Sequence, residues 1–495
     1  FLLYRKDRRK KKKMNTPIYH KLMQLKEEKR IPFHMPGHKR RGEDIFSEIA
    51  SVDITEITGY DNLHHPEGII RRSMDQLKEI YGTKESWYLV NGSTVGILAA
   101  ISSCCEAGDG ILLSRNCHKS VYNAIRLLRL HPYYFSFPVG EKYDLVEDMT
   151  KAEKTELEEI IKKHQDIRAV IFPSPTYEGV VMDVQGIKEI TEKAGIVLIV
   201  DEAHGAHFMF HDYFPDSAIK CGADLVIQST HKTLPSMTQT ALLHLCTDKI
   251  SPEKITDRLS IYETSSPSYI LMASAEYGVA YMQENRDKVE KYVDNLKKFR
   301  QKCAQLVNIH LIGKEEVAST DYDKGKLVFS VKNTNSNGHQ LFSWLLEKSG
   351  IEIEMADRTN CIAMTSVCDT KEDFALLFHE LEKFDQQIQQ CKGKEKAKTG
   401  KMDIPEKIME SWECESLPKT EVFLEDAVGK IAASFVMLYP PGIPLLVPGE
   451  KIVKETVENI RYYLYNGYNV LGLSGQRKKK MEVLYGRDVH CDGRT

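Results

Sequence analysis

The sequence lacks three features that would assign it quickly to a class of protein. None of its 11 cysteines forms a Cys-x-x-Cys pair, and an odd count in a 495-residue chain indicates reduced thiols rather than a disulfide framework. No apolar run approaches the roughly 18 residues that a membrane-spanning helix requires. The formal net charge is only −3, so no general basic field points to a nucleic-acid partner. We therefore expect a cytoplasmic protein with neither a membrane nor a nucleic acid as partner.

The first residues differ from the rest of the chain. Residues 1–13 contain eight Lys or Arg and one Asp, and they lack the apolar core of a secretory signal and the character of a transit peptide. A basic arm, a solvated tail and translated upstream sequence all fit this composition. We favour the last hypothesis, because Arg8 and Arg9 can be encoded by a sequence that resembles a bacterial ribosome-binding site and a lysine run then leads to Met14.

Short apolar runs alternate with helix-like segments through residues 14–300, which we interpret as one large domain. This alternation favours an α/β fold with a parallel sheet and helices on both faces. The predicted strands are 86–90, 110–113, 169–172, 196–200 and 225–228. The predicted helices are 95–105, 120–130, 151–164 and 185–194, followed by a continuous charged helical pattern over 274–307.

Three further parts follow the large domain. Residues 301–385 indicate a small α+β domain, with strands near 326–331, 351–355 and 361–366. Residues 386–402 are polar, charged and interrupted by Gly, which is typical of a linker. Residues 403–495 form a C-terminal α+β module.

Polar residues follow several predicted strands, where ligands of parallel α/β sheets bind. Gly92, Ser93 and Thr94 lie between a strand and a helix, and a helix N-terminus with two hydroxyls can hold a phosphate. Simple capping of the helix is the alternative. Asp201 ends a very apolar strand, and Lys232 follows the next one, where desolvation would lower its pKa and favour a nucleophilic amine.

His118 follows a further strand and could lie flat on an aromatic ligand, although a histidine at the edge of the core explains it equally well. A capping Asp and a surface Lys are the corresponding structural alternatives for Asp201 and Lys232. Taken together, an amine, a carboxylate, a phosphate site and a flat side chain match pyridoxal 5′-phosphate. Lys232 would bond to the cofactor, and Asp201 would keep its pyridine nitrogen protonated.

The segment 201–207 also permits two other interpretations. Its first four residues match a helicase motif, but the chain has no GxxxxGK[ST] phosphate loop. His204, His207 and His211 could be metal ligands, although their spacing matches no zinc-hydrolase pattern. A metal-dependent hydrolase that uses Asp201, His204 and His207 is therefore a distant alternative.

Eight short motifs, in order from about residue 15 to 450, resemble the bacterial ornithine/lysine/arginine decarboxylases, in their short form without an N-terminal receiver-like domain. The motifs are FHMPGHK (33–39), NGST (91–94), RNCHKS (115–120), PTYEG (175–179), DEAHGAH (201–207), STHK (229–232), ETSSPSY (263–269) and LYPPG (438–442). The resemblance implies the fold type I of pyridoxal-phosphate enzymes, whose large domain has a mostly parallel seven-stranded sheet.

The resemblance also implies a role for each matching residue. Lys232 would carry the cofactor, Asp201 would pair with the pyridinium nitrogen, and His118 would stack on the ring opposite Ala203. The residues implied to hold the phosphate are Gly92, Ser93, Thr94, Ser229 and His231, with Thr264 and Ser265 reaching the neighbouring subunit of a homodimer. The candidates for substrate contacts are Thr176, Tyr177 and Glu450, of which Glu450 would bind the distal cation.

The implied activity is decarboxylation of a basic amino acid to its amine, as a step that feeds polyamine synthesis. Arginine and lysine are favoured as substrates, and ornithine remains open. The main alternative is an aminotransferase or lyase of the same fold. In that case Arg358 would be the candidate clamp for the substrate carboxylate.

Overall fold

The computed structural model describes residues 14–28, 31–41, 44–391, 400–401, 404–439 and 442–488. The basic segment 1–13, which we interpret as translated upstream sequence, lies outside the described residues. Within the described ranges, no helix has the length and the apolar character needed to span a bilayer.

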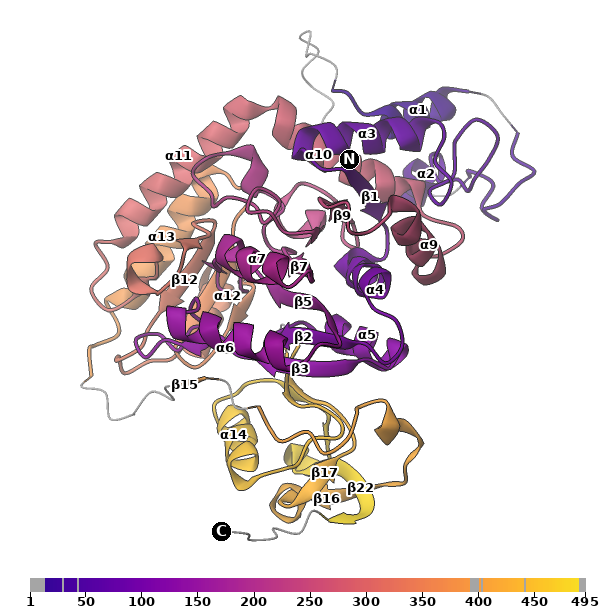
Figure 1. The fold of residues 1–495 in the computed structure, drawn as a ribbon. Coiled ribbons are helices and arrows are strands. Elements are labelled where there is room, and N and C mark those ends of the chain that lie inside the picture. The colour runs from indigo at the N-terminus through magenta and orange to yellow at the C-terminus, as the bar shows by residue number, and fades with distance from the viewer. Residues whose placement is uncertain are drawn as a thin grey trace.

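A seven-stranded sheet forms the centre of the large domain (Figure 1). The strand order is β1-β9-β8-β7-β5-β2-β3. Only β9 runs antiparallel to its neighbours, so the prediction of a mostly parallel seven-stranded sheet is confirmed. The strands are β1 (Glu85–Leu89), β2 (Gly110–Ser114), β3 (His131–Phe135), β5 (Ile167–Pro173), β7 (Val197–Asp201), β8 (Leu225–Gln228) and β9 (Ala241–Leu245).

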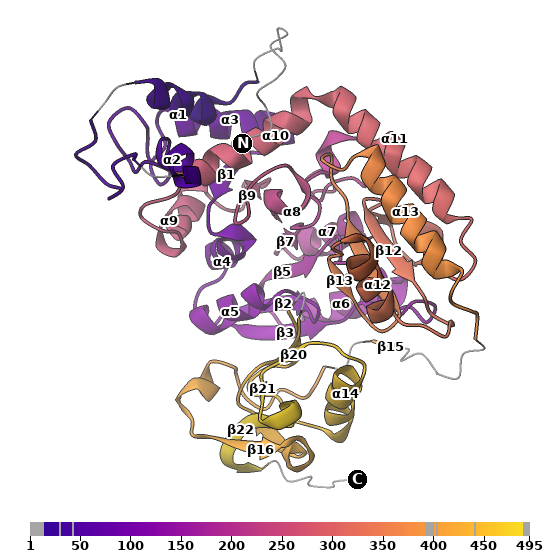
Figure 2. The ribbon, with the colours of Figure 1, turned by 180° about the vertical axis from the view of Figure 1, so that it is seen from behind.

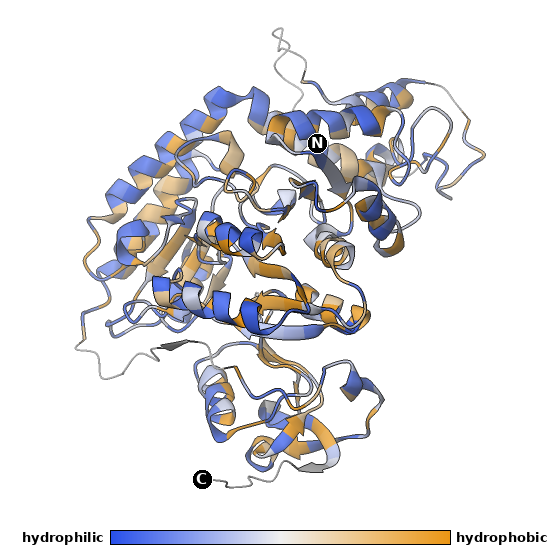
Figure 3. Ribbon diagram, viewed as in Figure 1, coloured by the Kyte–Doolittle hydropathy of each residue, from blue (hydrophilic) through white to orange (hydrophobic). Residues whose placement is uncertain are grey.

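Both faces of this sheet are covered, which explains why its central strands are predominantly apolar. In β5, Ala169 and Ile171 belong to one core, whereas Val170 and Phe172 belong to the other. The first core also receives α4 (Gly92–Cys104) and α5 (Lys119–Leu128), and the second receives α6 (Lys151–Lys163) and α7 (Val184–Lys193). Figure 3 shows this pattern as an apolar sheet between helices whose outer faces are polar.

The N-terminal helices lie at the β1 end of the sheet together with α9 (Pro252–Tyr262) and α10 (Tyr269–Glu284) (Figure 1). The N-terminal helices are α1 (Pro17–Glu27), α2 (Asp44–Ala50) and α3 (Ile69–Tyr81). Helix α11 (Arg286–Cys303) leads from α10 toward the small domain (Figure 1). The continuous helical pattern predicted over 274–307 is wrong at Asn285, which separates α10 from α11. Its backbone is not helical, and its side-chain Nδ2 donates to the carbonyl O of Tyr281 at 2.9 Å.

A four-stranded antiparallel sheet, in the order β10-β12-β14-β13, forms the small domain. Its elements are β10 (His310–Leu311), β12 (Lys326–Ser330), β13 (Met355–Ala356), β14 (Asn360–Met364), α12 (Gly338–Ser349) and α13 (Lys371–Asp385). The strand predicted near 351–355 is reduced to Met355 and Ala356. The small domain is joined to the large one by the pairing of β6 (Val180–Val181) with β11 (Asp321–Tyr322).

The C-terminal module lies beyond β2 and β3, as both views show (Figures 1 and 2). It has its own apolar core around Val436, Leu446 and Ile460. Its elements are β16 (Lys419–Phe423), β17 (Lys430–Ala432), β18 (Val436–Leu438), β19 (Ile443–Leu446), α14 (Lys454–Tyr465), β20 (Val470–Leu471), β21 (Leu473–Ser474) and β22 (Lys480–Asp488). In the connecting segment, β15 (Gly400–Lys401) pairs with β4 (Pro138–Val139) of the large domain.

Candidate active site

Three of the predicted site residues meet at one edge of the central sheet. Lys232 lies in the short helix α8 (Thr230–Thr233) after β8, Asp201 is the last residue of β7, and His118 caps α5 after β2. Burial lowers the pKa of His118, and the charges of Asp201 and Lys232 act on it in opposite directions. The three side chains therefore share one electrostatic environment at the carboxyl ends of the parallel strands.

The carboxylate of Asp201 can accept a further donor. The residue is only 7% exposed, and its Oδ1 accepts the backbone N–H of the buried Ala203 at 3.2 Å. A buried carboxylate is stable when a cation or a hydrogen-bond donor faces it. A protonated pyridine nitrogen would provide both.

The side chain of Lys232 is only partly exposed. Burial lowers its pKa, while the negative charges of Asp201 and Glu354 act in the opposite direction. Its Nζ lies 3.0 Å from Nε2 of His204. A lysine with a lowered pKa supplies more of the uncharged amine that attacks an aldehyde.

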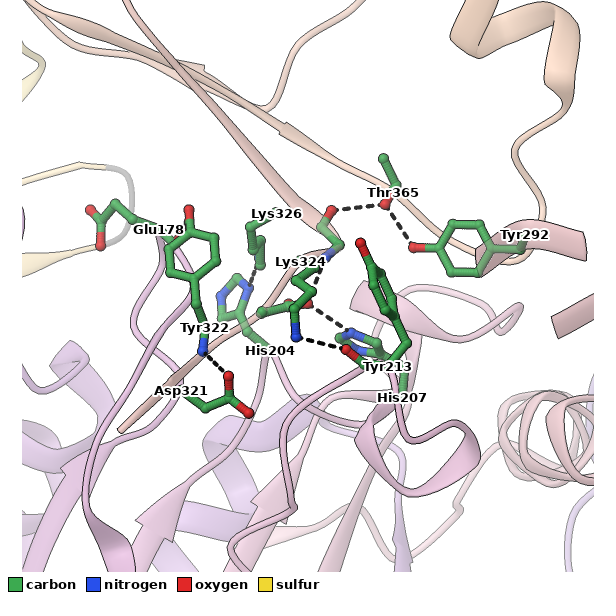
Figure 4. Close-up of polar contacts among 12 residues, drawn as sticks. Glu178, His204, His207, Tyr213, Tyr292, Asp321, Tyr322, Lys324, Lys326 and Thr365 are labelled. Atoms are coloured by element: carbon green, nitrogen blue, oxygen red, sulfur yellow. Dashed lines mark hydrogen bonds and ion pairs between the residues drawn. The ribbon is translucent and has the colours of Figure 1, made fainter. Parts of the chain in front are cut away.

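The two histidines of the DEAHGAH motif contact the small domain (Figure 4). His204 Nδ1 lies 2.7 Å from Lys326 Nζ, and His207 Nε2 lies 3.1 Å from Asp323 Oδ1. Each imidazole therefore has a side-chain partner within the protein, which explains its position without a metal ion. Among the described residues, no group of three His, Cys, Asp or Glu side chains is arranged to hold a metal ion.

The predicted phosphate-binding residues lie at the same edge of the sheet as Lys232. Helix α4 starts at Gly92, whose φ of +71° lies in the left-handed region, and Ser93 and Thr94 stand in its first turn. Because β1 and β8 both run antiparallel to β9, the start of α4 and the start of α8 lie at the same edge of the sheet. Helix α4 also lies very close to the sheet, since a Cβ on Gly96 would be 2.6 Å from Leu89 Cδ1.

The hydroxyl of Ser229 supports a phosphate at this position. Ser229 is fully buried, yet its Oγ has no hydrogen-bond partner within the described part of the chain. Buried polar groups normally have a partner, so an unpaired hydroxyl here fits an anion that the protein binds. His231 Nδ1 lies 2.8 Å from the carbonyl O of Thr240, which orients the ring and leaves Nε2 for a ligand.

The structure argues against the predicted role of Glu450. Its two carboxylate oxygens pair with the guanidinium of Arg115 at 2.7 and 2.8 Å, and Oε2 also accepts the N–H of Val447 at 2.8 Å. Both charged side chains are only 1% exposed. This occupied, buried carboxylate is not available to a substrate cation. It instead attaches the C-terminal module to the loop that carries His118.

The other sequence-predicted residues have varied positions. Thr176 is buried, and its Oγ1 accepts the N–H of Val180 at 3.2 Å. The ring of Tyr177 meets His204 edge to face at 4.8 Å, and its hydroxyl donates to Glu354. Thr264 and Ser265 are exposed between α9 and α10, so their contact with a second subunit stays a prediction.

Arg358, the candidate clamp of an aminotransferase, contacts the C-terminal module. Its Nη1 donates to the hydroxyl of Tyr462 in α14 at 3.0 Å. The sequence patterns did not identify Lys326, Arg115 and Glu354 as parts of the site. For Lys326 a signal was present, because this lysine precedes three apolar residues in a buried strand.

Comparison with known proteins agrees with this geometry. Residues 16–340 match the model of the Orn/Lys/Arg decarboxylase major domain, and residues 410–468 match that of the C-terminal domain. The uncharacterized protein YaaO of Bacillus subtilis is 33% identical over 95% of this chain and 98% of its own length. The arginine decarboxylase of Bacillus anthracis is 31% identical over 95% of this chain and 97% of its own length.

A solved structure gives the same result for the fold. The lysine decarboxylase LdcF of Francisella novicida superimposes with a TM-score of 0.81, at 17% identity, over 95% of this chain and 81% of that one. Both the domain models and the full-length relatives thus agree on one assignment. The chain belongs to the Orn/Lys/Arg decarboxylase family, whose members are pyridoxal-phosphate-dependent amino-acid decarboxylases.

Proposed function

We propose that this protein binds pyridoxal 5′-phosphate and decarboxylates a basic amino acid to the corresponding amine. Arginine is the first candidate substrate, because relatives that align over nearly the whole chain are named arginine decarboxylases; lysine and ornithine follow. The amine product would feed polyamine synthesis. The observation that carries the proposal is the convergence of Lys232, Asp201 and the predicted phosphate-binding residues at one edge of the sheet.

Each residue around the site would have a separate role in binding the cofactor. The cofactor, when bound, supplies an electron sink for the pair of electrons that carbon dioxide leaves behind. Lys232 would hold the cofactor covalently, and Asp201 would keep its ring nitrogen protonated. His118 would cover one face of the ring, with Ala203 on the other. The N-terminus of α4, with Ser93, Thr94, Ser229 and His231, would hold the phosphate.

Glu354 is the acidic group that we assign to the cationic end of the substrate, in place of Glu450. It is exposed, it accepts a hydrogen bond from Tyr177, and its charge reaches both Lys232 and Lys326. A carboxylate can bind a guanidinium through two bonds or an ammonium as a point charge. Glu354 therefore fits arginine and lysine alike.

A homodimer is part of the proposal. Thr264 and Ser265 are exposed in the single chain, as a role in a neighbouring site requires. Phe33 and Met35 lie two residues apart in the FHMPGHK motif and are 93% and 67% exposed, and exposed apolar patches often mark a protein interface. A cytoplasmic location is likewise proposed, supported by the free thiols of the cysteines in the described ranges.

Release of labelled carbon dioxide tests the function. Purified protein with pyridoxal phosphate should release label from carboxyl-labelled L-arginine, L-lysine or L-ornithine, with one equivalent of amine formed. The Lys232→Ala variant is the control and should release none. Formation of the keto acid without carbon dioxide would establish the aminotransferase alternative instead.

A further inference from the structure

The C-terminal module extends one hairpin toward the active site. Strands β18 and β19 pair antiparallel with Leu438 opposite Ile443, so Tyr439 and Gly442 lie at the tip of this hairpin. The N–H of Gly442 donates to the carbonyl O of Leu438 at 2.9 Å, and the φ of Gly442 is +106°. A glycine suits this turn because residues with a Cβ rarely adopt such a φ.

The tip of the hairpin approaches His118. A Cβ on Gly442 would lie 3.9 Å from Cδ2 of His118 and 4.0 Å from Cδ2 of Tyr439. His118 is the residue to which we assign one face of the cofactor ring. The hairpin therefore borders the space in which the substrate would react, and it brings the aromatic ring of Tyr439 to the edge of that space.

Tyr439 is also a neighbour of Tyr177. The Tyr177 hydroxyl donates to Glu354, and its ring meets His204 edge to face at 4.8 Å. Burial and Glu354 raise the pKa of Tyr177, and Tyr439 adds to the shift, as expected for two phenols that lie near each other. Tyr439 thus lies near both the His118 loop and the tyrosine that holds Glu354.

The backbone of the hairpin is fixed, whereas the ring of Tyr439 is open to a ligand. The N–H of Tyr439 donates to the carbonyl O of Asn469 at 2.9 Å, which extends the pairing of β18 with β20. The buried ion pair of Glu450 with Arg115 attaches the segment after β19 to the loop that carries His118. Tyr439 itself is 48% exposed. A tyrosine on a fixed backbone binds a ligand at a low entropic cost, because its side chain has only two χ angles.

We propose that Tyr439 is a specificity-determining residue whose ring binds the cationic end of the substrate. The guanidinium of arginine would lie against the face of Tyr439 while its charge pairs with Glu354. A guanidinium suits this arrangement better than an ammonium, because it stacks on aromatic faces and also forms two parallel bonds to a carboxylate. The inference rests on the proposed function and deepens it. It favours arginine over lysine, and it makes the C-terminal module part of the site.

Protection of Tyr439 from nitration tests this contact without turnover. Full-length protein with pyridoxal phosphate is treated with tetranitromethane, and mass spectrometry follows Tyr439, with Tyr465 and Tyr485, 91% and 70% exposed, as internal controls. Saturating agmatine, the amine that corresponds to arginine, should slow the nitration of Tyr439 severalfold and leave both controls unchanged. Pentylamine keeps the reacting amine but lacks the distal cation, so it should protect Tyr439 much less.

Substitutions of Tyr439 separate a ring contact from a structural role. Tyr439→Phe keeps the aromatic face, so KM for L-arginine should stay within about twofold of the wild type. Tyr439→Leu removes the face and should raise this KM about tenfold with little change in kcat, as expected for a partly desolvated cation–π contact. The rise for L-lysine should be smaller. The matched control Tyr485→Leu removes an exposed tyrosine of the same module and should leave KM unchanged.

Each possible result supports or overturns the role of Tyr439. Equal nitration of Tyr439 with and without agmatine, equal protection by pentylamine, or an unchanged KM in Tyr439→Leu would overturn it. If Tyr439→Leu fails to fold by circular dichroism, the nitration of the wild type still decides. A wild type that releases carbon dioxide but shows neither effect refutes this inference alone. A wild type that neither binds pyridoxal phosphate nor decarboxylates a basic amino acid refutes the proposed function, and the role of Tyr439 with it.

Discussion

Replacing Glu450 should destabilise the attachment of the C-terminal module rather than weaken substrate binding. Glu450 and Arg115 are each 1% exposed and joined by two bonds of 2.7 and 2.8 Å. Removal of one partner from such a buried pair leaves an uncompensated charge and costs about 3–5 kcal/mol. The change Glu450→Leu also leaves the N–H of Val447 without its acceptor.

Native-state hydrogen exchange measures the free-energy cost of losing this ion pair in the segment around Glu450. Amides of residues 443–452 should exchange faster in Glu450→Leu by about a hundredfold or more, since each 1.4 kcal/mol corresponds to a factor of about ten. The double variant Arg115→Met/Glu450→Leu should recover much of the loss, because two apolar side chains of similar size replace the pair. A double-mutant cycle then gives the coupling energy.

The same experiment separates a structural role from a substrate contact. If Glu450 bound the substrate cation, Glu450→Leu would raise KM while the exchange of residues 443–452 stayed as in the wild type. If the single variant lost less than about 1 kcal/mol, the assignment of Glu450 as a buried ion-pair partner would be wrong.

Three further predictions follow from the structure. Glu354→Gln should raise KM for the basic amino acid about tenfold in steady-state assays, as expected for the loss of a charged hydrogen bond, whereas the exposed neighbour Glu352→Gln should not. Burial raises the pKa of Glu263, which accepts the N–H of Val90, to about 7. Between pH 4.5 and 7 the folded chain therefore keeps a proton that the unfolded chain has lost, so the stability of the wild type falls as the pH rises through this window. Glu263→Gln does not titrate, and its thermal stability relative to the wild type should increase from pH 5 to pH 8. An equal difference at both pH values would contradict this. Gly96→Ala should cost about 1–3 kcal/mol of stability in thermal unfolding, because the new methyl group would meet Leu89 and Ile227 at 2.6 and 3.1 Å.

Much of the central sheet could be predicted because burial on both faces makes most of its strands predominantly apolar. Two strands were missed for physical reasons. β3 carries Pro132 and polar aromatic residues, as its position at the edge of the sheet allows. β9 contains the fully buried His244, whose Nδ1 lies 2.8 Å from the hydroxyl of Ser86, so that a polar residue interrupts the apolar pattern.

The residues of the site could likewise be predicted only in part. Lys232, Asp201 and His118 could be located because strand ends of a parallel sheet meet at one edge, a rule that needs only the order of elements. The contact of Lys326 with His204 and the pairing of Glu450 with Arg115 could not be predicted, because they join residues 122 and 335 positions apart. Such pairs depend on how the small domain and the C-terminal module are placed against the sheet, which local patterns do not encode.

The proposed chemistry depends most on Lys232 as the residue that bonds to the cofactor. The most direct measurement is borohydride reduction of the protein with pyridoxal phosphate, followed by peptide mapping. We expect one reduced adduct per chain, located on Lys232, and loss of the visible absorbance band and of the adduct in Lys232→Ala. An adduct on another lysine, or an unchanged band and adduct in the variant, would show that Lys232 does not bond to the cofactor.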